Sequence, residues 1–154
     1  MKNKKTALAI GIGILGLFGF TGQANATSNK VSANDELNRV DAVIYWKDTQ
    51  GRYIGANEAL RSMVGNDIVG KKDADIFTDK GFLDWIAKID GQVIQTGKAV
   101  LNIHESAQDS KGKTVRVISN KYPVKDAHGK VIGMFGLSVP DTDAKASDPK
   151  FYLK

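Results

Sequence analysis

The sequence predicts an α+β fold, in which an antiparallel sheet carries a flank of helices. Runs of β-branched and aromatic residues stand on both sides of short Asp-x-x-Gly segments, which is typical of strands joined by tight turns. In the middle of the chain the apolar residues change to helical spacing. The resulting order is β-β-α-α-α-β-β-β, so a helical segment separates two groups of antiparallel strands.

Composition limits the chemistry of the chain. Its 154 residues include 22 Lys and Arg, 17 Asp and Glu, two His and no Cys. This length suits one domain. The lack of cysteine excludes disulfides, thiolate metal sites and cysteine nucleophiles, and two histidines are too few for most histidine-rich metal sites.

The first 26 residues have the features of a secretory signal peptide. Three lysines stand within the first five positions, an apolar run covers 6–20, and Ala24-Asn25-Ala26 offers a small-x-small cleavage site. Cleavage near Ala26 would make the mature protein periplasmic or secreted. The alternative is a membrane tether formed by 6–20, although 15 residues with four glycines fall short of the roughly 20 that span a bilayer.

The net charge of +5 comes mostly from this segment. Its removal takes away three lysines and no acidic residue, which leaves 19 basic residues against 17 acidic ones. The remaining lysines are scattered among the acids. We therefore expect no nucleic-acid partner, because nucleic acids are bound by basic patches.

The N-terminal part of the mature chain is expected to hold one short helix and two strands. A polar lead-in covers 27–34, and a helix follows at 35–40 with acidic residues in its first turn. Such a helix packs across a sheet edge or pairs with a second copy. The segments 42–46 and 52–54 have the composition of strands.

Three hairpin turns are predicted by one repeated pattern. Asp-x-x-Gly occurs at 48–51, 109–112 and 126–129, each time with strand-like sequence on both sides. The Asp side chain can accept hydrogen bonds from backbone N–H groups ahead of it, and Gly supplies the positive φ that closes the turn.

Helices are predicted between the two groups of strands. Asn57 is a suitable N-cap for a helix at 58–64, and 73–77 should form one helical turn. A longer helix follows over 78–96 and stops at Gly97. Its apolar stripe consists of Phe82, Trp85, Ile86, Ile89, Val93 and Ile94.

The C-terminal strands are expected at 98–107, 113–124 and 131–139. The last of these is almost entirely apolar or small, which indicates a central strand buried on both faces. Gly133 and Gly136 would weaken it unless another group approaches its backbone closely.

Three sequence runs in this order resemble the PAS domain, a small sensory fold of bacterial signalling proteins. They are "VIYWKDTQGRYIGANEALRSMVGNDIVGKKDADIF" at the start, "GFLDWIAKIDGQVIQTGKAV" in the long helix, and "NKYPVKDAHGKVIGMFGLSV" in the last two strands. The resemblance covers about 35–142, which leaves a short C-terminal tail at 143–154. It implies a five-stranded antiparallel sheet with helices packed over one face.

The resemblance also implies that a small molecule can be held between sheet and helices. Family members hold haem, flavin, a carboxylic acid or another metabolite, and others hold nothing and mediate dimerisation. Cysteinyl-flavin and coumaroyl photochemistry are excluded because there is no cysteine, and haem is disfavoured because 78–96 contains no histidine. The cofactor expectation is therefore a non-covalent small molecule or none.

Six residues are candidates for contacts with such a ligand, since a few polar groups orient a guest in an apolar cavity. They are Tyr45, Trp85, His104, Arg116, Asn120 and Ser138.

Five of the six candidates also have a purely structural interpretation. Trp85 can belong to the core-facing stripe of its helix, and His104 can be an ordinary strand histidine. His104, Arg116 and Asn120 are equally suited to the solvent face of the sheet, because strand faces cannot be assigned from the sequence. The same holds for Ser138.

No catalytic or metal-binding arrangement is evident, so we predict a protein that is not an enzyme. The acids Asp73, Asp75 and Asp79 lack a calcium-loop pattern and are expected to be helix caps and solvated charges.

The predicted function is that of an exported PAS-type sensory module. It would bind a small molecule and signal through a separate partner, such as a membrane receptor or sensor kinase, because no output domain follows in the sequence. A homodimer is a further expectation. The alternative is a ligand-free module for protein–protein interaction or dimerisation.

Overall fold

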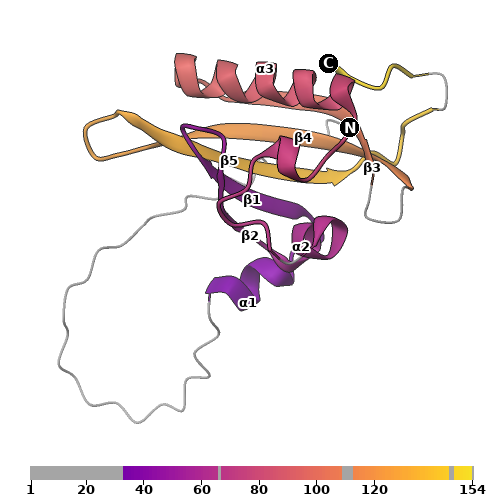
Figure 1. Cartoon of the computed structure of the whole chain (residues 1–154), viewed down its shortest axis with the longest axis horizontal. Helices are drawn as coiled ribbons and strands as arrows, with labels where there is room; N and C mark the ends of the chain where they lie inside the picture. The colour runs from indigo at the N-terminus through magenta and orange to yellow at the C-terminus, as the bar shows by residue number, and fades with distance from the viewer. Residues whose placement is uncertain (1–32, 66, 109–112, 146–147, 154) are drawn as a thin grey trace, which may run out of the picture. The chain divides into compact units, whose positions relative to one another are not determined.

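The computed structural model describes residues 33–65, 67–108, 113–145 and 148–153 (Figure 1). Its elements are α1 (Ala33–Asn38), β1 (Val43–Asp48), β2 (Tyr53–Ala56), α2 (Glu58–Val64), the 3-10 turn η1 (Asp73–Asp75), α3 (Lys80–Thr96), β3 (Val100–Gln108), β4 (Thr114–Lys125), β5 (Val131–Pro140) and β6 (Tyr152–Leu153). The predicted signal peptide at 1–26, the lead-in apart from its last two residues, and the turn at 109–112 lie outside the described residues.

The predicted antiparallel sheet is confirmed, with one strand more than expected. The strand order is β2-β1-β5-β4-β3-β6, and every neighbouring pair is antiparallel. The additional strand β6 comes from the C-terminal tail and pairs with Ile103 and His104 of β3. A two-residue strand leaves no periodic signal in the sequence, so pattern reasoning missed it.

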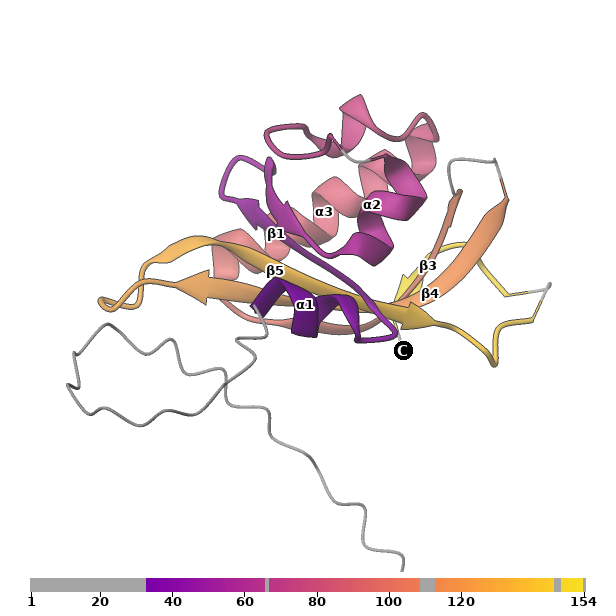
Figure 2. The ribbon, with the colours of Figure 1, turned by 90° about the horizontal axis from the view of Figure 1, so that it is seen from below.

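Helices α2 and α3 lie over one face of the sheet, and α1 lies on the other side (Figure 2). We call the face below α2 and α3 the inner face and the opposite face the outer face. The end of α1 is held to the β2–α2 junction, where Asn57 Nδ2 donates to Leu37 O (3.3 Å) and Glu58 N donates to Asn38 Oδ1 (2.8 Å). Within the described part of the chain, no helix is long and apolar enough to cross a membrane.

Two of the predicted Asp-x-x-Gly turns form with the same hydrogen bonds. Asp48 Oδ1 accepts from the backbone N–H groups of Gln50 (2.8 Å) and Arg52 (2.9 Å), and Gly51 has φ = 77°. At the second turn Asp126 Oδ1 accepts from the N–H groups two and four residues ahead, at 2.9 and 3.0 Å, and Gly129 has φ = 81°. The side chain of Asp therefore fixes each turn before the glycine closes it.

The predicted helix caps are also present. Asn57 Oδ1 accepts from Leu60 N at 3.3 Å and from Ile44 N at 3.0 Å, so this buried amide links α2 to β1. Helix α3 begins after Asp79, whose Oδ1 accepts from Phe82 N (3.0 Å). It ends at Gly97, which adopts the left-handed conformation with φ = 61°.

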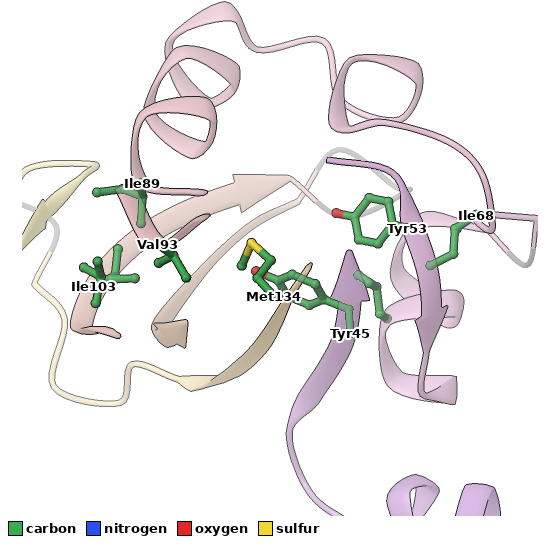
Figure 3. Packing of buried hydrophobic residues seen from close by; sticks show 9 residues of the cluster. Tyr45, Tyr53, Ile68, Ile89, Val93, Ile103 and Met134 are labelled. Atoms are coloured by element: carbon green, nitrogen blue, oxygen red, sulfur yellow. The ribbon is translucent and has the colours of Figure 1, made fainter. Parts of the chain in front are cut away.

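The core lies between the inner face and helices α2 and α3. Figure 3 shows Tyr45 of β1 beside Met134 of β5. The ring of Tyr45 covers Gly136 so closely that a Cβ atom there would overlap it, and a Cβ on Gly133 would overlap the carbonyl oxygen of Lys47. The expectation that another group approaches the backbone at these two glycines is thus confirmed.

Candidate ligand cavity

A cavity of about 60 Å³ lies between the inner face and the helices. The described residues around it come from β1, β2, α2, η1, α3 and the central strands. Most of its wall is apolar and consists of Val43, Leu60, Met63, Val64, Phe77, Phe82, Ile86 and Val117. This is the environment in which proteins bind small organic molecules, with few polar groups fixing the orientation of the guest.

Charged residues nevertheless complete the wall. Lys47 of β1, Lys121 of β4 and Glu105 of β3 all point to the inner face, because each stands at an even spacing from an apolar inner residue of its strand. Only 1% of each lysine side chain and 7% of the Glu105 side chain is exposed. Buried charges of this kind persist only when they are paired.

Lys47 is paired with two carboxylates from the helical side of the cavity. Its Nζ donates to both oxygens of Asp73 in η1, with the Oδ1 contact at 2.7 Å, and to Asp90 Oδ2 in α3 at 2.8 Å. The hydroxyl of Tyr53 donates to Asp73 Oδ1 at 2.8 Å. One lysine of the sheet thus connects η1 and α3 to the inner face.

Lys121 connects α3 to the other side of the cavity. Its Nζ donates to Asp90 Oδ1 at 2.8 Å and lies 3.6 Å from Glu105 Oε1. Ser119 Oγ donates to Glu105 Oε2 (2.8 Å) and lies 2.7 Å from Ser138 Oγ. The result is a continuous series of polar side chains from η1 to the serines of β4 and β5, which we call the polar chain. Its members are Asp73, Lys47, Asp90, Lys121, Glu105, Ser119 and Ser138.

The electrostatics of these side chains favour a charged Lys121 and a charged Asp90. Burial alone would raise the pKa of Asp90, but Lys121 and Lys47 outweigh it and hold that pKa below its ordinary value. Burial would likewise lower the pKa of Lys121, but its interactions with Tyr45, Asp90 and Glu105 hold it well above the ordinary value. Burial, followed by the nearby Asp73 carboxylate, raises the pKa of Tyr53 well above its ordinary value.

Two of the six predicted ligand-contact residues line the cavity. Tyr45 and Ser138 stand on the inner face of neighbouring strands. Trp85 lies on α3 and stacks on Phe151 of the C-terminal segment at 5.9 Å between ring centroids, away from the cavity wall. Its buried Nε1 has no hydrogen-bond partner among the described residues.

His104, Arg116 and Asn120 share a face, but it is the outer one. Each of them makes a contact with another part of the chain. His104 Nδ1 lies 2.7 Å from Asp141 Oδ2, Arg116 Nη2 donates to Asp148 O (3.1 Å), and Asn120 Oδ1 accepts from Asn102 N (2.9 Å). The structure therefore assigns these three side chains to loop and strand-edge contacts and not to the cavity.

Sequence reasoning missed the charged residues of the cavity. It expected Asp73 to be a helix cap or a solvated charge, whereas this carboxylate binds the buried Lys47. A signal was present in the sequence. Asp90 interrupts the apolar stripe of α3 between Ile86 and Val93, and a charge at a core position requires a buried partner.

Two larger hollows have a different character. One of about 300 Å³ lies near α1 and the start of α2, and one of about 440 Å³ lies between the β1–β2 turn and α3. Both are lined mainly by a mixture of exposed and half-buried residues, with the exposed Glu58 in the first and the exposed Asp84 in the second. The described residues contain no group of three or more His, Asp and Glu side chains arranged to hold a metal ion.

Known structures share this architecture at low sequence identity. One is VqmA bound to DPO, which has a TM-score of 0.63 and 22% identity, with coverage of 70% of this chain and 55% of that chain. Another is the PAS domain of a protein from Colwellia psychrerythraea, with a TM-score of 0.59, 15% identity and coverage of 70% and 92%. No curated protein matches the chain.

The expectation of no nucleic-acid partner was wrong. A VqmA–ligand–DNA complex from Vibrio cholerae has the same fold, with a TM-score of 0.62, 22% identity and coverage of 70% of this chain and 49% of that chain. This fold therefore occurs within a DNA-binding protein, so a small net charge does not exclude nucleic acid. The chain spans about half the length of the VqmA chains that it matches.

A family model described as the PAS fold matches residues 37–146. This match covers most of the chain and agrees with the six-stranded antiparallel sheet and its helices. The family is in general sensory and regulatory. On this evidence the chain belongs to the PAS fold family.

Proposed function

We propose that the protein is an exported PAS-type sensory domain that binds a small molecule in the 60 Å³ cavity and signals through a separate partner protein. The observation that carries this proposal is the combination of an apolar wall with a buried polar chain on the inner face. A packed core of this size needs no buried lysines, whereas a binding site needs a few polar groups in an apolar setting.

The ligand-bound VqmA structure supports the first part of the proposal. A domain with a TM-score of 0.63 to this one is described as bound to DPO, which makes ligand binding compatible with this architecture. Its identity of 22% leaves the ligand of the present protein open.

The polar chain suggests how binding would produce a signal. Asp73 and Asp90 belong to η1 and α3, and both bind Lys47 of the sheet. A ligand that contacts these groups changes the balance between arrangements of the helices over the sheet. It can do so only to the extent that it binds one arrangement more tightly than another.

Export rests on the features of the first 26 residues. We propose a periplasmic or secreted protein, with a tether at 6–20 as the alternative. A membrane receptor or sensor kinase is the kind of partner that an exported sensor requires. Edman sequencing of the protein isolated from its own cells tests this step, since cleavage gives an N-terminus near Thr27 and retention gives an intact start.

Native mass spectrometry of the purified protein tests ligand binding. The expected spectrum contains the chain with a discrete additional mass that is lost on denaturation. Val117→Phe provides a variant in which a ring fills the cavity, and Ile118→Phe is its matched control because the next residue of β4 faces outward. The additional mass should disappear with Val117→Phe and remain with Ile118→Phe; its presence in both variants would contradict a ligand in this cavity.

One observation favours a second candidate function, the docking of a protein on the outer face. The rings of Trp46, Phe135 and Tyr122 form a row there, with centroids 5.4 and 6.3 Å apart, and Tyr122 is exposed. Aromatic rows on a surface are typical of protein interfaces. Tyr122→Ser would abolish association in this case and leave the additional mass in the spectrum unchanged.

A further inference from the structure

One polar atom of the cavity has no hydrogen-bond partner. Glu105 lines the cavity, and its Oε1 is buried and accepts no hydrogen bond from any described residue. The other oxygen of the same carboxylate accepts from Ser119 Oγ at 2.8 Å. A buried carboxylate oxygen without a hydrogen-bond donor is costly, because it has lost its hydration, and the ion pair with Lys121 at 3.6 Å is too long to replace a hydrogen bond.

The formal charges of the polar chain also indicate that Glu105 lacks a positively charged partner of its own. The two lysines, Lys47 and Lys121, face three carboxylates, those of Asp73, Asp90 and Glu105. With all five groups ionised, one negative charge remains unbalanced. The short contacts of the lysines go to Asp73 and Asp90, so the excess falls on Glu105, whose nearest cation is 3.6 Å away.

We propose that the ligand is a small organic ammonium ion, whose N–H group donates to Glu105 Oε1. This inference rests on the proposed function, since it names the chemistry of the molecule that the cavity receives. The bound cation balances the excess charge and supplies the missing donor in a single contact. Charge-assisted hydrogen bonds of this kind are stronger than neutral ones.

A carboxylate ligand fits the same site poorly. All three contacts of Lys47 are already made to Asp73 and Asp90. Lys121 is held between Asp90 and Glu105. An incoming anion would therefore find no uncommitted lysine and would add to the negative excess.

The rest of the ligand must be short and apolar. The cavity measures about 60 Å³, and apart from Asp73 the residues opposite the sheet are aliphatic and aromatic, among them Leu60, Phe77 and Ile86. A short carbon chain behind the ammonium group matches this wall.

Three four-carbon probes test the head group at constant chain length. Butylammonium, butan-1-ol and butyrate are titrated into the ¹⁵N-labelled protein at pH 7, and the amide shifts of Glu105 and Val117 are followed. We expect butylammonium to bind with a Kd about tenfold or more below that of butyrate. Glu105→Gln should weaken butylammonium binding by about tenfold or more, and Glu36→Gln, an exposed glutamate on α1, should leave it unchanged.

The comparison of probes on the unaltered protein keeps the test valid if Glu105→Gln fails to fold. Preferential binding of butyrate, or equal binding of all three probes, would overturn the inference. So would the absence of any shift, which would leave water as the partner of Glu105 Oε1. The native mass spectrum distinguishes failure of the ammonium inference from failure of the proposed function. An additional mass that proves to lack an N–H donor refutes the ammonium ligand alone. A spectrum without any additional mass counts against ligand binding itself.

Discussion

The two faces of the sheet reverse the usual placement of two lysines and of three aromatic rings. On β4, Ser119 and Lys121 point inward and Tyr122 points outward; on β1, Lys47 points inward and Trp46 outward. The buried face thus carries ions and hydroxyls beside its apolar residues and the ring of Tyr45, and the outer face carries a row of three rings. In a sheet whose side chains contribute only to the stability of the fold, we would expect these rings to be buried and the lysines to be exposed.

This reversal indicates that the inner face is shaped by something other than stability. Replacing buried ion pairs with apolar residues is often neutral or stabilising, so a fold alone gives no reason to keep them. The polar chain instead joins η1 and α3 to the sheet through Lys47 and Asp90. Most of the following predictions compare a position on the inner side with a matched position outside it.

The largest expected effect is at neighbouring residues of β4. Lys121→Met leaves the carboxylates of Asp90 and Glu105 short of a buried cation and should lower the free energy of unfolding by about 3 kcal/mol or more. Tyr122→Ala on the outer face should cost about 1 kcal/mol. Urea denaturation measures both.

The double variant Lys121→Met with Glu105→Gln sharpens this prediction. It removes one charge of each sign and should recover part of the loss. Equal costs for Lys121→Met and Tyr122→Ala would mean that the inner charges are solvated and not buried.

A glycine-to-alanine change should have opposite signs at two sites. In Gly136→Ala the new methyl overlaps the ring of Tyr45, which must move, at a cost of about 2 kcal/mol. Gly91 lies within α3 with no close neighbour but the end of Gln95, so Gly91→Ala should stabilise by up to about 1 kcal/mol. Thermal unfolding of the two variants gives the comparison, and a stabilised Gly136→Ala would show that the tyrosine does not cover this backbone.

The dependence of stability on pH should arise from the inner face. Because the folded pKa of Asp90 is below its ordinary value of about 3.9, its contribution is present above that value and is lost as the pH falls through the lower folded pKa. The folded pKa values of Lys121 and Tyr53 are raised, so their contributions are present below about pH 10 and are lost as the pH rises further.

Asp90→Asn should therefore flatten the acidic limb of a plot of unfolding free energy against pH. Asp84→Asn, a change on the exposed side of the same helix, should leave that limb as steep as before. An unaltered limb in Asp90→Asn would show that this carboxylate does not gain from its lysines.

The smallest expected effect is at Asn120. Asn120→Ser removes the acceptor for the exposed Asn102 N–H and should cost less than about 1 kcal/mol. It should not change ligand binding, because Asn120 is on the outer face. A loss of the bound mass in this variant would assign the binding site to the outer face.

The fold could be predicted because its signals are local. Asp48 with Gly51 and Asp126 with Gly129 each determine a turn within four residues, and Asn57 and Gly97 mark the ends of helices. These signals need no knowledge of distant contacts.

The site could be predicted only in part because it depends on which strand face is buried. Period two places His104 and Glu105 on opposite faces of one strand and Asn120 and Lys121 on opposite faces of the next, but it does not say which face lies under the helices. The apolar and aromatic residues Trp46 and Tyr122 favour the wrong answer, since burial of rings is the usual expectation.

The central claim is that the inner face receives a small molecule, and amide shifts in the NMR spectrum test it most directly. The ¹⁵N-labelled protein is titrated with the small-molecule fraction of an extract of its own cells. The account predicts shifts at Tyr45, Val117 and Ser138, all lost in Val117→Phe and kept in Ile118→Phe. Shifts confined to Trp46 and Tyr122 would contradict it, because the rings of the outer face would then be the binding surface.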